Sequence, residues 1–290
     1  MRYILKSAKS ALALTWLVAT SNGALAQLPT QPSTNLRSNN VTFDYIEPRD
    51  PKWLPVYDRL KKRQVLEAFS EFLSPLRLPV TYRLKTKQCD ESDAFYGGSR
   101  GADDNEWSTR YCYELVDDTE KTAPKKTTPE GLTRGEYIVG TFVGTVLHET
   151  GHALSDMLKL PVLGREEDSA DQISGFFMLQ FGSELARATI KGTYYNWMQD
   201  ARLDPNLNWD VHSTNRQRAQ NYLCMGFGGQ PETFKDLVEK GLLPKARADN
   251  CAREYQEAKR AFTQTILPFI DQDLMRQVQS KQWFRPHEFD

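Results

Sequence analysis

His148-Glu149-Thr150-Gly151-His152 and Glu167-Asp168-Ser169-Ala170-Asp171 are the two stretches around which this chain is organised. If the first stretch is helical, its two histidines lie four residues apart on one face, so both imidazoles can meet one metal ion. Glu149 then lies beside that ion. There a carboxylate can take a proton from a water molecule whose pKa the metal lowers from about 15.7 toward about 7. The first stretch therefore predicts a metal centre with its own general base.

Two imidazoles do not complete a catalytic zinc site, which usually has three protein ligands and one position for water or substrate. We expect Glu167 to be the third ligand of one Zn²⁺ per chain. It follows His152 by fifteen residues, enough for the first helix to end, the chain to turn at residues 160–164 and a second helix to begin. Asp171, one turn after Glu167, faces the same way and can accept the free N–H of a ligating histidine, which fixes its tautomer.

These motifs are similar to those of the gluzincin, or thermolysin-like, zinc metallopeptidases. The metzincin pattern does not fit, because it needs Gly and His where this chain has Ser155 and Leu158. Over roughly residues 43–255 the chain also resembles a family of exported bacterial proteins described as metallopeptidases. That likeness rests on residues 89–96, 112–115, 148–156, 163–172, 212–213, 217–218, 221 and 224. The resemblance implies an α+β zincin fold with an N-terminal twisted sheet and helices, a central metal helix and a mainly helical C-terminal half.

The alternative interpretation of the second stretch is an acidic first helical turn, where the macrodipole favours solvated Asp and Glu. Glu166 and Asp168 fit that description. Two observations favour a metal site for Glu167 and Asp171. Two of the four histidines of the chain lie in the first motif. The helix that carries them would also be buried, where unpaired polar groups are costly, because apolar or small residues recur at helical spacing at Val143, Leu147, Gly151, Leu154 and Leu158.

The N-terminus has the pattern of a signal peptide. Arg2, Lys6 and Lys9 precede an apolar run over residues 11–19, and Ala24-Leu25-Ala26 supplies small residues for cleavage. The run is too short for a stable membrane anchor, and no later segment approaches eighteen apolar residues. We therefore expect a mature protein without a membrane anchor, located in the periplasm or outside the cell.

Three segments follow from this: a signal peptide over residues 1–26, a flexible leader over 27–40 and a zincin-like metallopeptidase domain over 41–290. Removing the signal peptide leaves 34 basic and 38 acidic residues, a formal charge of −4. This mixed charge gives no basic footprint, so we expect no nucleic-acid partner.

Local patterns predict the flanking elements. We expect strands at 41–46 and 79–84, one helical stretch over 56–73, and a charged loop over 116–134 before a metal helix that starts near Gly135. Beyond the second motif, Gly182 and Gly192 are expected to punctuate helices. A turn follows at Asp204-Pro205-Asn206, and another helix is expected to open at 209–213 and run to Tyr222.

Residues 93–96 and 111–115 are aromatic, β-prone runs that predict a hairpin. Residues Ala94, Phe95 and Tyr96 resemble the edge strand of thermolysin-like enzymes, to which an extended peptide adds by main-chain hydrogen bonds. Asp93 departs from that pattern, since an ionised carboxylate accepts but does not donate. The alternative is an ordinary hairpin of the core.

Four cysteines in an exported chain indicate two disulfides, with three connectivities possible. We expect the sequence-local pairs, Cys89 with Cys112 and Cys224 with Cys251. A zinc–cysteine site is the competing interpretation, but the chain has no C-x-x-C spacing.

His212 resembles, in its order along the chain, the distant histidine or tyrosine with which gluzincins stabilise the oxyanion. The alternative is a surface histidine near a helix start. Arg216 and Tyr222 are weaker candidates for the same role.

The function predicted from these resemblances is zinc-dependent hydrolysis of peptide bonds in a peptide or protein substrate, with Glu149 as general base and His212 as a second catalytic residue. Two alternatives remain at this point. One is a zincin-fold protein that binds peptides or proteins with little turnover, and the other is a zinc amidase acting on cell-wall peptides. The sequence carries no prediction of oligomeric state.

Overall fold

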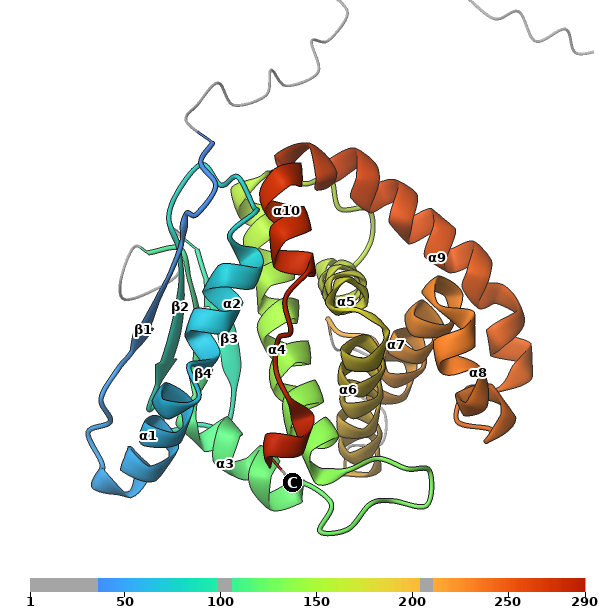
Figure 1. Cartoon of the computed structure of the whole chain (residues 1–290), viewed down its shortest axis with the longest axis horizontal. Helices are drawn as coiled ribbons and strands as arrows, with labels where there is room; N and C mark the ends of the chain where they lie inside the picture. Colours follow the sequence, from blue (N-terminus) through green and yellow to red (C-terminus); the bar gives the residue numbers. More distant parts are fainter. Residues whose placement is uncertain (1–35, 99–105, 204–210, 290) are drawn as a thin grey trace, which may run out of the picture. The chain divides into compact units, whose positions relative to one another are not determined.

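A four-stranded mixed sheet occupies the N-terminal side of the fold, in the order β1-β2-β4-β3 (Figure 1). Its strands are β1 (Val41–Tyr45), β2 (Tyr82–Lys87), β3 (Ala94–Gly97) and β4 (Ser108–Cys112). The first three in this order are parallel, and β3 pairs antiparallel with β4 to form one edge. The strand predicted at 41–46 is confirmed, while β2 begins three residues later than predicted.

The computed structural model describes residues 36–98, 106–203 and 211–289, which all belong to the unit Asn35–Asp290. The predicted signal peptide, residues 27–35 of the leader and the turn at Asp204-Pro205-Asn206 lie outside the described residues. Within the described part, Arg37 pairs with Leu78. No helix of the described ranges is long and apolar enough to cross a membrane.

The helical stretch predicted over 56–73 is two helices, α1 (Leu54–Lys62) and α2 (Val65–Leu73). Gln64 separates them because its backbone is left-handed, with φ 52°. The break turns the apolar face of α2, including Leu66 and Phe69, into the core beside β1.

The charged loop predicted over 116–134 was wrong in its first part, and so was the strand beyond Cys112. Residues Tyr113–Thr122 form helix α3. Tyr113 and Val116 are buried three residues apart, while Asp, Glu and Lys occupy other positions, so the segment is amphipathic at helical spacing. Its charged residues are adequate helix formers once one face has a core to cover.

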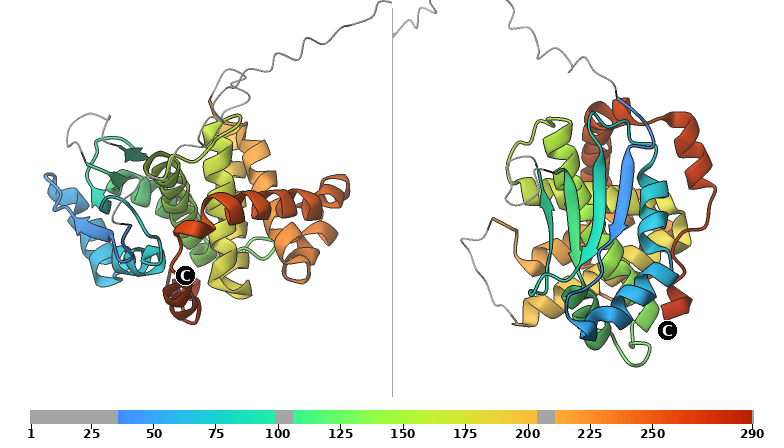
Figure 2. Two further views of the ribbon diagram at one scale, coloured as in Figure 1. Left: turned by 90° about the horizontal axis from the view of Figure 1, so that it is seen from above. Right: turned by 90° about the vertical axis from the view of Figure 1, so that its left-hand side faces the viewer.

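Helix α4 (Arg134–Met157) carries the first motif through the middle of the fold (Figure 1). It begins one residue before the predicted start, at a capping box in which Thr133 and Glu136 satisfy each other's backbone N–H groups. The right-hand view of Figure 2 shows the strands side by side in front of the helices. Tyr82 of β2 reaches Thr150 of α4 with a hydroxyl–hydroxyl distance of 3.2 Å.

The C-terminal half is helical, as predicted, and the fold is therefore α+β. Its helices are α5 (Glu166–Met178), α6 (Ser183–Leu203), α7 (Asn215–Gly229), α8 (Pro231–Glu239), α9 (Lys245–Thr265) and α10 (Gln272–Gln279). The helix expected to open at 209–213 begins only at Asn215, because Thr214 and Gln217 form a capping box there. The chain finally returns to α2, where the ring of Phe284 packs against that of Phe69 at a centroid distance of 4.7 Å and a tilt of 42°.

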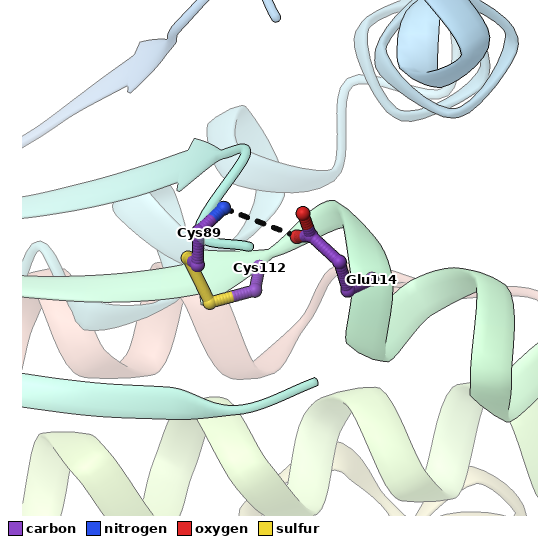
Figure 3. Close-up of side chains that lie close together, drawn as sticks. All are labelled: Cys89, Cys112 and Glu114. Atoms are coloured by element: carbon purple, nitrogen blue, oxygen red, sulfur yellow. Dashed lines mark hydrogen bonds between the residues drawn. A yellow bond between two sulfur atoms is a disulfide. The ribbon is translucent and has the colours of Figure 1, made fainter. Parts of the chain in front are cut away.

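Both predicted disulfides are confirmed, Cys89–Cys112 and Cys224–Cys251. The first joins the segment after β2 to the end of β4 (Figure 3). Glu114, beside it, accepts hydrogen bonds from the backbone N–H groups of Cys89 and Asp90. Since both sulfurs are bonded to each other, this group of cysteines and glutamate is not a metal site.

Gly182 separates two helices at φ 87°, as predicted, but Gly192 lies inside α6. Its role is close packing. A Cβ atom on Gly192 would lie 2.2 Å from the carbonyl oxygen of Glu136, and one on Gly140 would lie 2.6 Å from the Cα of Gly192. Helices α4 and α6 therefore cross with their backbones almost in contact.

We expect Gly192→Ala to lower the free energy of unfolding by about 1–3 kcal/mol, the usual cost of overpacking. Alanine favours a helix over glycine by about 1 kcal/mol, so a net loss isolates the clash with α4. Gln256→Ala, at an exposed position in the middle of α9, is the control and should change stability by less than about 0.5 kcal/mol. Denaturant unfolding of the three proteins measures this, and a stabilised Gly192→Ala variant would contradict the packing argument.

Candidate active site

The two histidines of the first motif lie on one face of α4 and point to the same place. His148 Nε2 and His152 Nε2 are 3.3 Å apart, and the rings are perpendicular. His148 is buried and His152 is partly exposed, so the pair stands where the helix meets open space. The helical spacing of the motif produces this convergence directly.

Glu167, in the first turn of α5, brings a carboxylate to the same place. Its Oε2 atom is 3.1 Å from His148 Nε2 and 3.3 Å from His152 Nε2. The approach depends on Gly151 within the motif, since a Cβ atom there would lie 2.8 Å from the Cα of Ala170 on α5. A small residue on each helix therefore lets α5 pack close enough for its carboxylate to reach the imidazoles.

The three atoms fit a metal ion. Bonds of about 2.0–2.2 Å in a tetrahedron put neighbouring ligand atoms about 3.3–3.6 Å apart, close to the 3.1–3.3 Å that separates these three atoms. Two imidazoles and one carboxylate also form a donor set that zinc accepts in catalytic centres. The residues present therefore match a zinc ion in both chemistry and spacing.

The outer nitrogen of each histidine is held by a carboxylate. His148 Nδ1 lies 2.9 Å from Asp171 Oδ1, and His152 Nδ1 lies 2.9 Å from Glu166 Oε1. Such contacts orient the rings and direct Nε2 toward the centre. The interpretation of Glu166 as a merely solvated charge was therefore incomplete.

Asp171 is itself fixed by buried donors. Arg218 donates to both of its oxygens at 2.7 Å, and the Tyr222 hydroxyl donates to Oδ1 at 3.0 Å. Burial by itself would raise the pKa of Asp171, but hydrogen bonds from His148 and Arg218 outweigh that effect and lower the pKa to about 2. Asp171 is consequently ionised at neutral pH and can accept a hydrogen bond from His148 Nδ1.

The charges of the centre favour a bound cation. Burial opposes protonation of His152, but its hydrogen bonds to Glu167 and Glu166 prevail and raise its pKa to about 9. Although burial would raise the pKa of Glu167, hydrogen bonds from the histidines hold it far below the usual range. The cluster thus attracts positive charge, which a proton or a metal ion can supply.

Glu149 lies beside this centre and is buried. Its Oε2 accepts a hydrogen bond of 2.7 Å from the backbone N–H of Tyr96, on strand β3. Burial raises the pKa of Glu149, while the nearby histidines oppose the shift. The carboxylate faces an open cleft of about 580 Å³ that is also lined by the metal-centre residues and by β3.

The predicted edge strand is an edge strand of the sheet and lines this cleft with residues 93–96. Asp93 uses its carboxylate within the strand, where Oδ1 accepts from the N–H of Ala94 at 2.8 Å. A second hollow of about 630 Å³ borders the strand and is lined by residues such as Lys87 and Arg110 instead of the metal centre.

His212 lies at the metal centre and not on a remote surface. Its Nε2 is 2.9 Å from Glu167 Oε2. The segment is tied to α5, because Arg165 donates to the carbonyl of His212 and Ser213 donates to Asp168. His148, Glu167 and His212 have ligand atoms within 4.8 Å of one another, so His212 is placed either to donate to a substrate or to bind the metal.

Sequence reasoning gave no role to Arg218, although the resemblance includes residues 217–218, and none to Trp197. The Arg218 guanidinium lies 3.6 Å from the centroid of the Trp197 ring and 3.4 Å from His148 Nδ1. Two other residues were weaker candidates for the role of His212. Tyr222 is buried and donates to Asp171, and Arg216 is exposed. No spacing in the sequence marks Arg218, since its partner Asp171 is 47 residues away.

Two imidazoles and a carboxylate converge in this cleft, and a second, buried glutamate lies beside them. These are the groups that a metal-dependent hydrolase needs, three metal ligands and a base. The model of a protein family described as "Putative metallopeptidase" matches residues 45–266. Because this match covers most of the chain, the protein belongs to that family. Comparisons with curated proteins and with solved structures found no match. Membership in this family supports a metal-dependent peptidase. It confirms the predicted resemblance to metallopeptidases.

Removal of a ligand tests the metal centre. Purified protein should contain one zinc ion per chain, and His148→Ala or Glu167→Ala should lose most of it. Asp171→Ala and Glu166→Ala should retain the ion with affinity reduced by roughly ten- to a hundredfold, as losses of orienting partners do. Elemental analysis and competition with a chromophoric chelator measure both effects. Full zinc occupancy in Glu167→Ala would move the third ligand to another residue.

Proposed function

We propose that this protein is an exported zinc metallopeptidase with a gluzincin-like zincin fold. The observation that carries the proposal is the position of Glu149, a buried carboxylate in the cleft beside the point where His148, His152 and Glu167 converge. A zinc ion held by those three residues would polarise the scissile carbonyl and acidify water. The signal-like N-terminus and two disulfides support an exported protein.

Glu149 is suited to the proton transfers. It would take a proton from the attacking water and pass it to the leaving amine. Burial raises its pKa, which makes the carboxylate a stronger base than an exposed glutamate. The hydrogen bond from Tyr96 N–H holds the carboxylate in one orientation. This bond fixes the position of the Glu149 carboxylate relative to the edge strand. A peptide bound along β3 would therefore lie at a defined distance from the base.

His212 would donate to the oxyanion that forms as the carbonyl is attacked. Its position against Glu167 on the cleft wall supports this role, and the tethers from Arg165 and Ser213 would limit its movement. Asp171 and Glu166 would keep the two motif imidazoles directed at the centre throughout.

The variant Glu149→Gln tests the peptidase. Glutamine has nearly the shape of glutamate but cannot accept a proton from water at neutral pH, so the variant should keep zinc and peptide affinity while losing almost all cleavage. Peptide-library cleavage by the wild type, with and without chelator, is the reference measurement. If the wild type cleaves nothing and both proteins bind one partner equally, the protein is a binding protein with a zincin-like site.

His212→Ala separates the two roles open to that residue. An oxyanion donor should give a variant with full zinc occupancy and a kcat lower by roughly a hundred- to a thousandfold. The readouts are zinc content and steady-state kinetics on one peptide. Loss of zinc would make His212 a metal ligand, and unchanged values of both would remove it from the mechanism.

A further inference from the structure

The cleft extends beyond the metal centre along a wall formed by α4 and α6. Its lining there consists of Thr141, Gly144, Thr145, Thr193, Asn196, Trp197 and Asp200. The α6 residues recur at spacings of three and four, so they share one face of that helix. This wall is polar, apart from one tryptophan and one glycine, and it contains a single acidic residue.

The threonines of the wall present acceptors. Thr145 donates its hydroxyl hydrogen to the carbonyl of Thr141 at 2.9 Å, and Thr193 donates to the carbonyl of Gly140 at 2.8 Å. A hydroxyl has one hydrogen and two lone pairs, so the partly exposed Thr145 keeps lone pairs for a ligand in the cleft, whereas Thr193 is buried. The chemistry of the wall is therefore complementary to a donor-rich group.

The charges at this wall also favour a ligand that donates hydrogen bonds. Arg218 borders the wall, but it binds both oxygens of Asp171 and stacks on Trp197, so its charge is already balanced. Asp200 is half-buried one turn beyond Trp197. Among the residues that the structure describes, none forms a hydrogen bond or ion pair with its carboxylate. Burial raises the pKa of Asp200 more than Arg218 lowers it, so a cationic ligand would stabilise the ionised carboxylate.

We propose that this wall is a subsite for a basic side chain of the substrate, lysine or arginine, and that Asp200 determines this specificity. The inference rests on the proposed peptidase function and names its substrate class. An ammonium or guanidinium group offers only donors, which match the carboxylate and the threonine lone pairs. An apolar side chain would instead further desolvate an unpaired carboxylate, which is unfavourable.

Kinetics with paired peptides test the specificity. In a neutral peptide that the wild type cleaves, lysine is placed at each position in turn and compared with glutamine. At one position lysine should raise kcat/KM by about ten- to a hundredfold over glutamine, and in Asp200→Asn the ratio of the two kcat/KM values should fall to about one. The control is Asp249→Asn, an exposed change of the same charge on α9, which should keep the preference. An equal preference in Asp200→Asn and wild type would overturn the proposal.

Binding separates this inference from the proposed function. The Glu149→Gln protein, titrated calorimetrically with the lysine and glutamine peptides, should bind the lysine peptide more tightly, and adding Asp200→Asn should remove the difference. If the wild type cleaves no peptide but this difference in binding appears, the hydrolase proposal fails and the basic subsite stands. If lysine and glutamine peptides bind Glu149→Gln equally, the subsite is wrong whether or not the wild type is a peptidase.

Discussion

The contact between Gly151 on α4 and Ala170 on α5 is the constraint on which the site depends. A side chain at residue 151 would have to occupy space within 2.8 Å of the α5 backbone. Moving α5 outward to make that space would carry Glu167 and Asp171 away with it. One close helix crossing thus fixes the distances of both carboxylates to His148. The glycine that looks incidental inside the first motif has a packing role, and the chemistry depends on that packing.

Burial of this many ionisable groups is tolerable only because each has partners. Asp171 receives donors from His148, Arg218 and Tyr222, and Arg218 gains the face of Trp197. A buried carboxylate stripped of one such donor would retain its desolvation cost without the compensating bond. The network therefore holds the two imidazole rings in a fixed set of orientations. Asp200 on the cleft wall is the exception, because no described residue pairs with its carboxylate. That lack of a partner is the reason for proposing that it binds a ligand.

Much of the centre could be predicted because it depends on local periodicity. The four-residue spacing of His148 and His152 and the four-residue spacing of Glu167 and Asp171 specify helix faces without knowledge of the rest. The break between α1 and α2 and the additional helix α3 could not be predicted from local periodicity. Gln64 ends a helix with an unusual backbone conformation, and α3 forms from a charged segment only because Tyr113 has a core to enter. Arg218 reaches Asp171 through tertiary packing alone, across 47 residues.

The return of the C-terminal segment to α2 bears on the order in which the chain can fold. Phe284 and Trp283 pack on Phe69 and Phe72, more than two hundred residues earlier in the chain. Helix α2 in turn covers the sheet beside β1. The core around α2 therefore includes contacts across more than two hundred residues, and contacts of such high sequence separation form slowly because their loop-closure entropy must be overcome. The sheet that carries the edge strand thus rests on a helix whose own packing is completed by distant parts of the chain.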